Sequence, residues 1–392
     1  MTHLMSNYGR LPISFVRGQG TRLYDEQDNE YLDFTSGIAV TNLGHCHPNV
    51  TAALQEQAAT LVHTSNLFQI PKQEAVAAKL CELSGLDQVF FCNSGAEANE
   101  AAIKLARKHS KEKYGEHKFE ILTLEDGFHG RTLATVTATP RKKFQEGFAP
   151  LMPGFRYVPK DLAAIEAAIS ENTCALMMEP VQGEGGVLPL TPEFLQGVRA
   201  LCDKHGLLLI FDEVQTGIGR TGTMFAFEQA GVQPDILTLA KALGNGIPVG
   251  ATLAKAEVAS AFTPGTHGST FGGTPLVMAA VLATLETIES ENILQNAKEM
   301  GIELGLRLQG LIEQHDCLLE LRGLGLLRGV TMDRPVAPLI NKCRELGLLV
   351  LSAGENTLRI IPPLTVTSQD IHLAIKILEQ AVQEVAQGVA QA

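Results

Sequence analysis

Two short apolar runs in the middle of the chain each lead into a residue that can do chemistry. The run from Leu207 to Phe211 is followed directly by Asp212, and the run from Ile236 to Leu239 is followed two positions later by Lys241. An apolar run of this length that stops at a charged residue is typical of a buried strand in a parallel sheet. Open α/β sheets bind their ligands at the carboxyl ends of such strands. The sequence therefore predicts an aspartate and a lysine on one rim of a sheet.

An aspartate and a lysine on one rim suit a particular cofactor chemistry. A lysine amine can form a Schiff base with the aldehyde of pyridoxal phosphate (PLP), and a carboxylate can keep the pyridine nitrogen protonated so that the ring accepts electrons. The alternative is a structural ion pair, or two strand ends that have nothing to do with each other. Asp212 and Lys241 by themselves leave both interpretations open.

A dinucleotide fingerprint lies between these two strands, but its context is wrong. Residues Gly217 to Gly222 match the pattern G-x-G-x-x-G. That motif requires a strand immediately before it and a helix that opens from it. Here the segment DEVQT separates the glycines from the strand, and the segment TMFAF that follows is a poor helix former. We therefore do not predict a nicotinamide or flavin dinucleotide site.

Composition narrows the class of protein. The chain has 392 residues, 45% of them apolar and 19% charged, which suits a globular protein of two or three units. A net charge of −12 argues against nucleic acid as a partner. Seven cysteines without a closely spaced pair indicate reduced thiols, and no apolar run has the length of a signal peptide core or a membrane span. We expect a cytoplasmic protein with no membrane partner.

Metal binding is also not expected. His45, Cys46 and His47 stand together, but no second group of ligands follows at the spacing of a metal site.

A second candidate site combines a strand, a turn of small residues and a helix. The strand is predicted over Gln88 to Cys92, and a helical segment begins after Ser94. Free backbone N–H groups and the helix dipole at such a start favour an anion, for example a phosphate. Ser94 is also a good N-cap, so that a plain capped helix explains the same residues. The two interpretations are compatible.

Two further segments carry groups that could contact a ligand. Phe128 and Arg131 follow a predicted strand at Phe119 to Leu124, where an aromatic ring could stack on a cofactor and an arginine could hold a carboxylate. Equally, Phe128 could belong to the core and Arg131 to the surface. The loop from Pro264 to Pro275 is rich in serine, threonine and glycine, which suits either anion binding or an ordinary surface loop.

The order of predicted elements defines the fold class. Strands and helices alternate through the middle of the chain, which predicts βαβ units and a mainly parallel sheet. A hairpin is expected within residues 16–34, and the last part of the chain mixes strands and helices as an α+β unit. We predict an N-terminal segment at 1–55 that joins the small domain, a large domain at 56–275 and a small C-terminal domain at 276–392.

Seven motifs taken together resemble a known family. They occur in the order expected for it and span nearly the whole chain: NSGAEANEAAIKLAR, FHGR, EPVQGEGG, FDEVQTGIGRTG, LAKALGNGIPVG, HGSTFGG and LRIIPPL. The set is similar to the class III (ornithine-type) PLP-dependent aminotransferases. The resemblance implies fold type I of the PLP enzymes, an α/β fold. In this fold, helices flank a mainly parallel, seven-stranded sheet in the large domain, and the smaller domain is α+β.

The resemblance implies roles around the cofactor ring. Lys241 is the catalytic lysine that holds the cofactor covalently and, once displaced by substrate, moves a proton between substrate and cofactor. Asp212 pairs with the pyridinium nitrogen and Gln215 lies by the ring hydroxyl. Phe128 stacks on the ring.

The resemblance also implies a phosphate site and a shared active site. Gly95 and Ala96 give backbone amides to the phosphate, helped by Ser94. Thr270, with Ser269, reaches the phosphate of the neighbouring subunit. The implied assembly is a homodimer in which each subunit completes the site of the other.

The implied reaction is transamination between two unlike substrates. Within the family the chain is most similar to members that take the δ-amino group of N-acetylornithine, in arginine biosynthesis, and pass it to 2-oxoglutarate to make glutamate. Arg131 then binds the α-carboxylate of the ornithine-type substrate, and Arg359 that of glutamate. Because an unpaired buried charge is costly, we expect Glu184 to neutralise Arg359 in the first half-reaction and to move away in the second.

The identity of the amine donor stays open at this point. Ornithine aminotransferases carry a tyrosine in the segment where Ile38 stands, and its loss leaves room for an acyl group. N-succinylornithine, N-succinyl-diaminopimelate, ornithine and 4-aminobutyrate are alternatives. A PLP aminomutase would keep Asp212 and Lys241 without a second carboxylate-binding arginine. A non-enzymatic binding protein would have lost Lys241.

Overall fold

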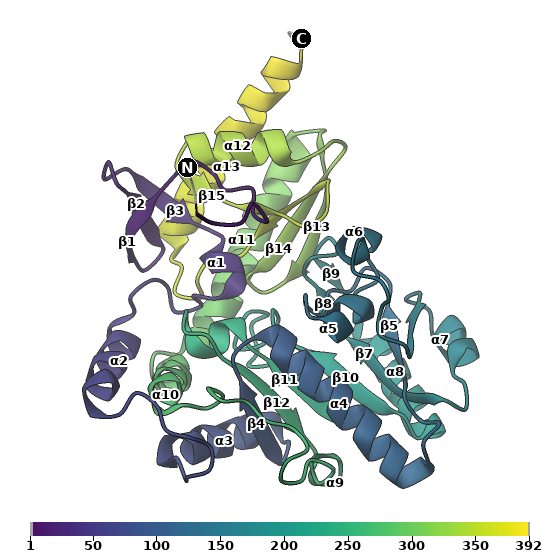
Figure 1. Cartoon of the computed structure of the whole chain (residues 1–392). Helices are drawn as coiled ribbons and strands as arrows, with labels where there is room; N and C mark the ends of the chain where they lie inside the picture. Colours follow the sequence, from purple (N-terminus) through teal and green to yellow (C-terminus); the bar gives the residue numbers. More distant parts are fainter. Residues whose placement is uncertain (1–2, 391–392) are drawn as a thin grey trace.

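The computed structural model describes residues 3–390, and the side chains up to residue 386. Figure 1 shows two groups of elements, one around a large sheet and one around the long helices α11 and α13. The first and the last described segments of the chain both belong to the second group.

The large sheet has seven strands in the order β4-β12-β11-β10-β7-β5-β6. Strand β12 is antiparallel to both of its neighbours, and the other strands run parallel to one another. This confirms the prediction of a mainly parallel sheet. The central strands β7 and β10 are buried at every position, as expected for strands covered on both faces. The bounds are β4 (Gln88–Cys92), β5 (Glu120–Leu124), β6 (Phe155–Val158), β7 (Thr173–Met178), β10 (Leu208–Asp212), β11 (Ile236–Leu239) and β12 (Gly250–Ala254).

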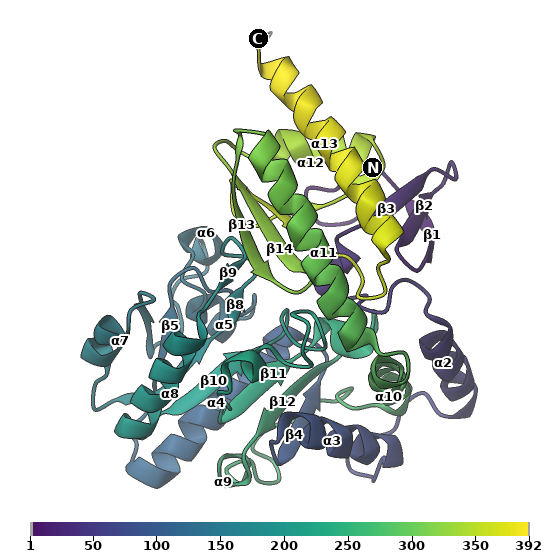
Figure 2. The ribbon, with the colours of Figure 1, turned by 180° about the vertical axis from the view of Figure 1, so that it is seen from behind.

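Helices cover both faces of this sheet, as Figures 1 and 2 show from opposite sides. Helix α4 (Gly95–Tyr114) packs on β11 and β12, whereas α8 (Pro192–His205) packs on β10 and on α7 (Leu162–Ala168). The sequence sets the ends of α8 locally. The Thr191 hydroxyl accepts the backbone N–H of Phe194, Pro192 occupies the first turn, and Gly206 ends the helix at a φ of 64°.

Three further helices pack together, and one of them, α3, contacts the edge strand β4. Helix α10 packs against both α2 and α3, and α3 packs on β4. These helices are α2 (Pro48–Thr60), α3 (Pro71–Ser84) and α10 (Pro275–Ser290), and each carries a proline in its first turn. Short elements complete the large-sheet region: α5 (Leu133–Ala138), α6 (Lys142–Gln145), α9 (Ala256–Ala259), β8 (Val181–Gln182), β9 (Leu188–Pro189) and the 3₁₀ turns η1 (Ala226–Ala230) and η2 (Lys241–Gly244).

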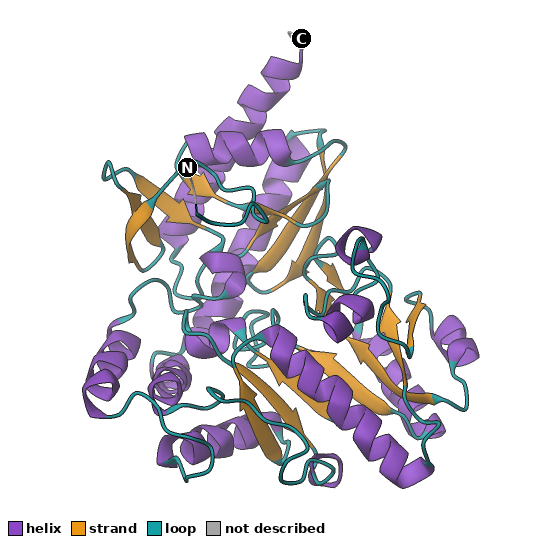
Figure 3. Ribbon diagram, viewed as in Figure 1, coloured by secondary structure: helices purple, strands orange, loops and turns teal. Residues whose placement is uncertain are grey.

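The C-terminal region is built on an antiparallel sheet of order β13-β14-β17-β16, against which α11 packs (Figure 3). The N-terminal strands join this region, because β3 pairs in parallel with β15. The predicted hairpin is present as β2 and β3, which pair antiparallel on either side of the turn at 26–29. The bounds are β1 (Phe15–Gln19), β2 (Arg22–Asp25), β3 (Glu30–Asp33), α1 (Ser36–Ala39), α11 (Ile293–Gln314), β13 (Leu318–Leu324), β14 (Leu327–Met332), α12 (Ala337–Glu345), β15 (Leu348–Leu349), β16 (Leu351–Ser352), β17 (Thr357–Ile360) and α13 (Ser368–Ala390).

The exact domain limits remain a prediction. Helix α2 runs across the proposed limit at 55/56, and the limit at 275/276 falls in the first turn of α10.

The loop that carries the dinucleotide-like glycines joins these regions. Arg220 is completely buried, and its guanidinium donates hydrogen bonds to the carbonyl oxygens of Leu326 (3.1 Å) and Pro362 (2.5 Å) and to the side-chain oxygen of Asn42. The burial lowers the pKa of Arg220 to about 9. The motif therefore serves as a structural junction.

Candidate active site

The rim predicted from the sequence is present. Strands β10 and β11 are parallel neighbours, with Asp212 opposite Thr238, so that their carboxyl ends lie side by side. A cavity of about 600 Å³ opens at this rim. It is lined by eight residues that the sequence analysis singled out: Ser94, Gly95, Ala96, Phe128, Arg131, Asp212, Gln215 and Lys241.

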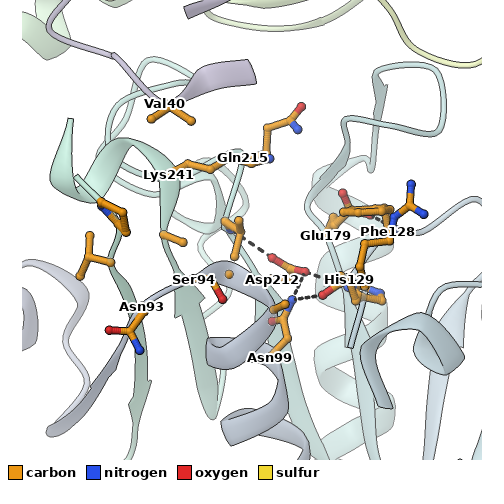
Figure 4. A pocket seen from close by; sticks show the side chains of 18 of the residues that line it. Val40, Asn93, Ser94, Asn99, Phe128, His129, Glu179, Asp212, Gln215 and Lys241 are labelled. Carbon is orange, nitrogen blue, oxygen red and sulfur yellow. Dashed lines mark hydrogen bonds and ion pairs between the residues drawn. The ribbon is translucent and has the colours of Figure 1, made fainter. Parts of the chain in front are cut away.

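Asp212 is buried at the end of β10 and held by three hydrogen bonds. Its Oδ2 accepts from Asn99 Nδ2 at 2.7 Å and from His129 Nδ1 at 2.8 Å, and its Oδ1 accepts the backbone N–H of Val214 at 3.1 Å. Figure 4 shows Asn99 and His129 both pointing at the carboxylate. A carboxylate can accept about four hydrogen bonds, so Oδ1 retains capacity for one more donor.

The groups that hold Asp212 are themselves fixed. Asn99, on α4, also donates to the backbone oxygen of His129 at 2.7 Å and accepts the hydroxyl of Thr238 at 2.7 Å. Each of these side chains is almost completely buried. We call Asp212, Asn99, His129 and Thr238 the Asp212 network.

His129 stabilises the negative charge on Asp212. Burial lowers its pKa, but the hydrogen bond to Asp212 and the charges of Asp212 and Glu179 outweigh burial, so that the net pKa lies above the ordinary value. A protonated imidazole donates from both nitrogens. In the described part of the chain the buried Nε2 of His129 has no hydrogen-bond partner.

Lys241 begins the 3₁₀ turn η2 just after β11, and its backbone is left-handed with a φ of 46°. This conformation is uncommon for a residue with a side chain and clusters at functional sites. Burial lowers the pKa of the Lys241 amine, although the carboxylates of Glu184, Asp212 and Glu179 act in the opposite direction. A lowered pKa leaves more of the amine in the neutral, nucleophilic form.

The start of α4 supplies the predicted anion site. The Ser94 hydroxyl caps the helix by accepting the backbone N–H of Glu97 at 3.2 Å. The next two amides, of Gly95 and Ala96, have no acceptor within the helix and lie on the cavity. A Cβ on Gly95 would come within 2.7 Å of the Val214 side chain, so only glycine fits between the helix start and the strand end.

These groups fit PLP. A carboxylate with a free acceptor position, a lysine of lowered pKa and a helix start with two free amides line one cavity, and they match the ring nitrogen, the aldehyde and the phosphate of that cofactor.

Phe128 lines the cavity beside a buried acid. The Phe128 backbone N–H donates to Glu179 Oε2 at 2.8 Å. Burial raises the pKa of Glu179 to about 7, helped by the charge of Asp212 and opposed by that of His129. Figure 4 shows Glu179 next to Phe128.

Arg131 lies at the outer part of the cavity and is exposed. Its guanidinium carbon lies 3.7 Å from the ring centre of Phe144 and 5.8 Å from that of Phe128. The arginine is therefore held by stacking on an aromatic ring, in a position to meet a carboxylate.

Glu184 and Arg359 form the ion pair that the sequence analysis expected. The Nη1 of Arg359 contacts Glu184 Oε1 and also donates to the backbone oxygen of Gly183 and to Gln215 Oε1, both at 3.2 Å. Gln215 Nε2 donates to Glu184 Oε1 at 3.4 Å, so both ends of its amide belong to this group. Burial raises the pKa of Glu184, but Arg359 outweighs it and the net pKa is lowered. We call Arg359, Glu184 and Gln215 the Arg359 network.

Ser269 and Thr270 lie outside the cavity of their own chain. The Ser269 hydroxyl accepts from Asn93 Nδ2 at 3.1 Å and from the backbone N–H of Gly272 at 3.0 Å, whereas Thr270 is exposed. Asn93 lines the cavity, so Ser269 is one residue removed from it.

Several residues of the site were not predicted from the sequence. Asn99, His129 and Glu179 lay inside quoted motifs, yet each acquires its role only through a partner far along the chain, such as Asn99 with Asp212 across 113 positions. Tyr8 and Val40 of the N-terminal segment also line the cavity. The available signal for Asn99 and Glu179 was that they are polar residues inside motifs of the family.

No group of histidine, cysteine or acidic residues that could hold a metal ion occurs in the described part of the chain. Among the described residues no helix is long and apolar enough to cross a membrane.

The chain belongs to the aminotransferase class III family, which it matches over residues 4–382. It is therefore a PLP-dependent transaminase, as the cavity geometry indicates.

Several named members of the family are similar to this chain over nearly its whole length. The chain is 49% identical to the acetylornithine aminotransferase of Methanocaldococcus jannaschii, over 96% of this chain and 95% of the relative, and 52% identical to that of Halalkalibacterium halodurans, over 98% and 99%. Among solved structures it is similar to the acetylornithine aminotransferase of Elizabethkingia anophelis (37% identity, TM-score 0.87, 97% of this chain and 96% of that one). It is also similar to the ornithine aminotransferase of Toxoplasma gondii (33%, 0.95, 98% and 94%).

Proposed function

We propose that the enzyme transfers the δ-amino group of N-acetylornithine to 2-oxoglutarate, which yields N-acetylglutamate 5-semialdehyde and glutamate. The observation that carries the proposal is the Arg359 network beside the cavity. Arg359 is 3% exposed and already neutralised by Glu184, so a substrate with an uncharged acyl end meets no unpaired positive charge. The curated relatives named acetylornithine aminotransferase support the same donor.

Each residue around the cofactor has a separate role in the two half-reactions. PLP, when bound, supplies an aldehyde and an electron-withdrawing ring that stabilises negative charge on the substrate carbon. Asp212, held by Asn99 and His129, keeps the ring nitrogen protonated. The Lys241 amine would accept the proton from the substrate carbon and return it to the carbon that comes from the cofactor aldehyde. Ser94 and the first amides of α4 bind the phosphate.

Substrate recognition uses the two arginines at different times. Arg131, stacked on Phe144, binds the α-carboxylate of the first substrate. In the second half-reaction the dicarboxylate brings its own carboxylate to Arg359, and Glu184 moves away. Glycines at 183, 185 and 186 give the Glu184 segment the backbone freedom that such a movement needs.

The acyl group is the finer point of the proposal. Val40 lines the cavity with an apolar side chain, and Ile38, two positions earlier, is 42% exposed and has a left-handed backbone conformation. An apolar side chain at Val40, without a tyrosine hydroxyl in this segment, favours an acylated donor over ornithine. N-succinylornithine, N-succinyl-diaminopimelate and 4-aminobutyrate remain competitors, and so does an aminomutase reaction.

A panel of amine donors tests the function. Purified enzyme with 2-oxoglutarate and each donor is assayed for glutamate, and N-acetylornithine is expected to give the highest kcat/KM. A higher value with ornithine or 4-aminobutyrate, or isomerisation without glutamate formation, would reject the proposal.

We infer that two copies of the chain share their active sites. Leu67, Phe68 and Phe271 are 61–89% exposed, and Asn66 ties their two segments together by donating to the backbone oxygens of Ser269 (3.1 Å) and Gly272 (2.9 Å). An exposed apolar patch of this kind suits a protein interface. A second copy docked there brings Thr270 to the partner's phosphate.

The cysteines are free thiols, which suits the cytoplasm.

The Thr270→Val variant tests this assembly. It is expected to raise the PLP dissociation constant about tenfold, because it removes one charge-assisted hydrogen bond to the phosphate worth about 1.5 kcal/mol. Sedimentation and cofactor absorbance report the outcome. A fully active, PLP-saturated monomer would contradict the shared site.

A further inference from the structure

Three positively charged side chains surround one aromatic ring at the outer edge of the cavity. Around the ring centre of Phe144 lie the Cζ of Arg131 at 3.7 Å, the Nζ of Lys143 at 5.1 Å and the Cζ of Arg141 at 5.9 Å. We call Arg131, Arg141 and Lys143 the cationic cluster. In the described part of the chain none of the three forms an ion pair.

The cationic cluster is continuous with the active site. The Phe144 ring packs edge-on against Phe128 at 5.9 Å and 84°, and both Phe128 and Arg131 line the cavity. On its other side, Arg141 Nη2 lies 3.4 Å from the point where a Cβ on Gly185 would stand, next to Glu184. Figure 1 shows α6, which carries Phe144, beside β8 and β9.

The local charge opposes that of the whole chain. The net charge of the protein is −12, yet Arg131 at the cavity and the two cations that share the Phe144 ring with it have no ion-pair partner among the described residues. The nearby Asp126 carboxylate is engaged by Lys160 at 3.1 Å, and Asp126 offers Arg141 only its backbone oxygen, at 3.0 Å. Like charges gathered around one ring repel each other, and an anion bound among them relieves that repulsion.

We propose that the cationic cluster is an approach site that captures dicarboxylate substrates before they enter the cavity. A dicarboxylate carries two negative charges and can engage Arg141 or Lys143 while its other end reaches Arg131. The amine donor is a zwitterion without net charge and gains little from the same site. This inference rests on the proposed function, because it takes 2-oxoglutarate as the acceptor.

The test removes the two outer charges and leaves Arg131 in place. In the double variant Arg141→Gln/Lys143→Gln, the rate constant for 2-oxoglutarate reacting with the amine-loaded enzyme at low substrate is measured by stopped-flow absorbance. We expect about a tenfold fall at low ionic strength, since charged clefts raise substrate capture by this order. The difference is expected to vanish near 0.5 M salt, where the Debye screening length is about 4 Å. The saturating rate changes less than about twofold, because the effect is on capture.

Two control variants separate charge at the cavity from charge in general. Lys108→Gln/Lys111→Gln removes the same number of charges from the outer face of α4, where both lysines form ion pairs with Glu112 and Glu116. It is expected to behave as the wild type. The variant Arg141→Lys/Lys143→Arg keeps the charges with different geometry and is expected to retain capture of the dicarboxylate.

The outcomes decide the proposal. An equal loss in both double Gln variants, an equal loss for the zwitterionic donor, or a fall in the saturating rate with unchanged capture would each overturn it. Failure of N-acetylornithine as donor would affect only the donor measurement. The 2-oxoglutarate measurement uses enzyme loaded from glutamate and stands independently.

Discussion

The Asp212 network and the Arg359 network bound the same active site, but they are built in opposite ways. Members of the first lie on β10, β11, α4 and the turn after β5, and all are nearly fully buried. Glu184 of the second lies in a glycine-rich loop with a 28% exposed side chain, and the Nε of Arg359 has no partner among the described residues. The first is suited to hold one charge in place throughout the cycle. The second is suited to exchange partners.

The largest effect is expected at Lys241, which lies between the two networks. Lys241→Ala removes both the covalent attachment of the cofactor and the proton transfer, and we expect kcat to fall by more than about 10³-fold. Borohydride treatment followed by peptide mapping should locate the cofactor on residue 241 of the wild type. Transamination by the variant at the wild-type rate would contradict the central assignment.

The rigidity of the Asp212 network is tested at Asn99. Asn99→Ala leaves Asp212 with one donor fewer and the buried Thr238 hydroxyl without its acceptor. We expect kcat to fall by about 10–100-fold and the free energy of unfolding to drop by about 2 kcal/mol. The matched control is Asn93→Ala, which removes a half-buried asparagine from the same cavity outside the network. Equal effects of the two substitutions would show that Asn99 has no special role.

The mobility of the Arg359 network is tested at Glu184. Glu184→Ala leaves Arg359 unpaired, which opposes the acetylornithine half-reaction but favours a substrate that brings its own carboxylate. We expect the first half-reaction to slow about tenfold and the glutamate half-reaction to stay the same or to accelerate. Single-turnover spectra of each half-reaction report the difference, with the exposed Glu125→Ala as control. Equal slowing of both would remove the exchange of partners from the mechanism.

The smallest effect is expected at Glu179, a buried acid next to the Asp212 network. Because its folded pKa is raised to about 7, its contribution to stability is present at low pH and is lost as the pH rises from about 4.5 to 7. Glu179→Gln keeps an oxygen for the Phe128 N–H and carries no charge. We expect thermal unfolding of the variant to match the wild type at pH 5 and to exceed it by about 2 °C at pH 8. A larger gain at pH 5 would contradict this titration.

The sequence predicted the Arg359 network more completely than the Asp212 network, since all three members of the first were named from the resemblance and only Asp212 of the second was named. Asp212 and Lys241 follow apolar runs, and a run of that kind predicts a buried strand and its rim without any knowledge of the partners. The Glu184–Arg359 pair was reached from the cost of a buried charge together with the family resemblance. Asn99 and His129 were not predicted, because nothing near them in the sequence indicates that α4 and the turn after β5 converge on β10. The ring of Phe144 escaped notice for the same reason.

Arg220 has a consequence for the way the molecule unfolds. One buried guanidinium holds a carbonyl before β14, a carbonyl after β17 and a side chain in the N-terminal segment. Separating the large sheet from the C-terminal region would break these hydrogen bonds together and admit water to a packed junction, so we expect the two regions to open together. Amide protons of the two regions should therefore exchange with solvent in one cooperative step. Neither region is expected to fold well when it is expressed without the other.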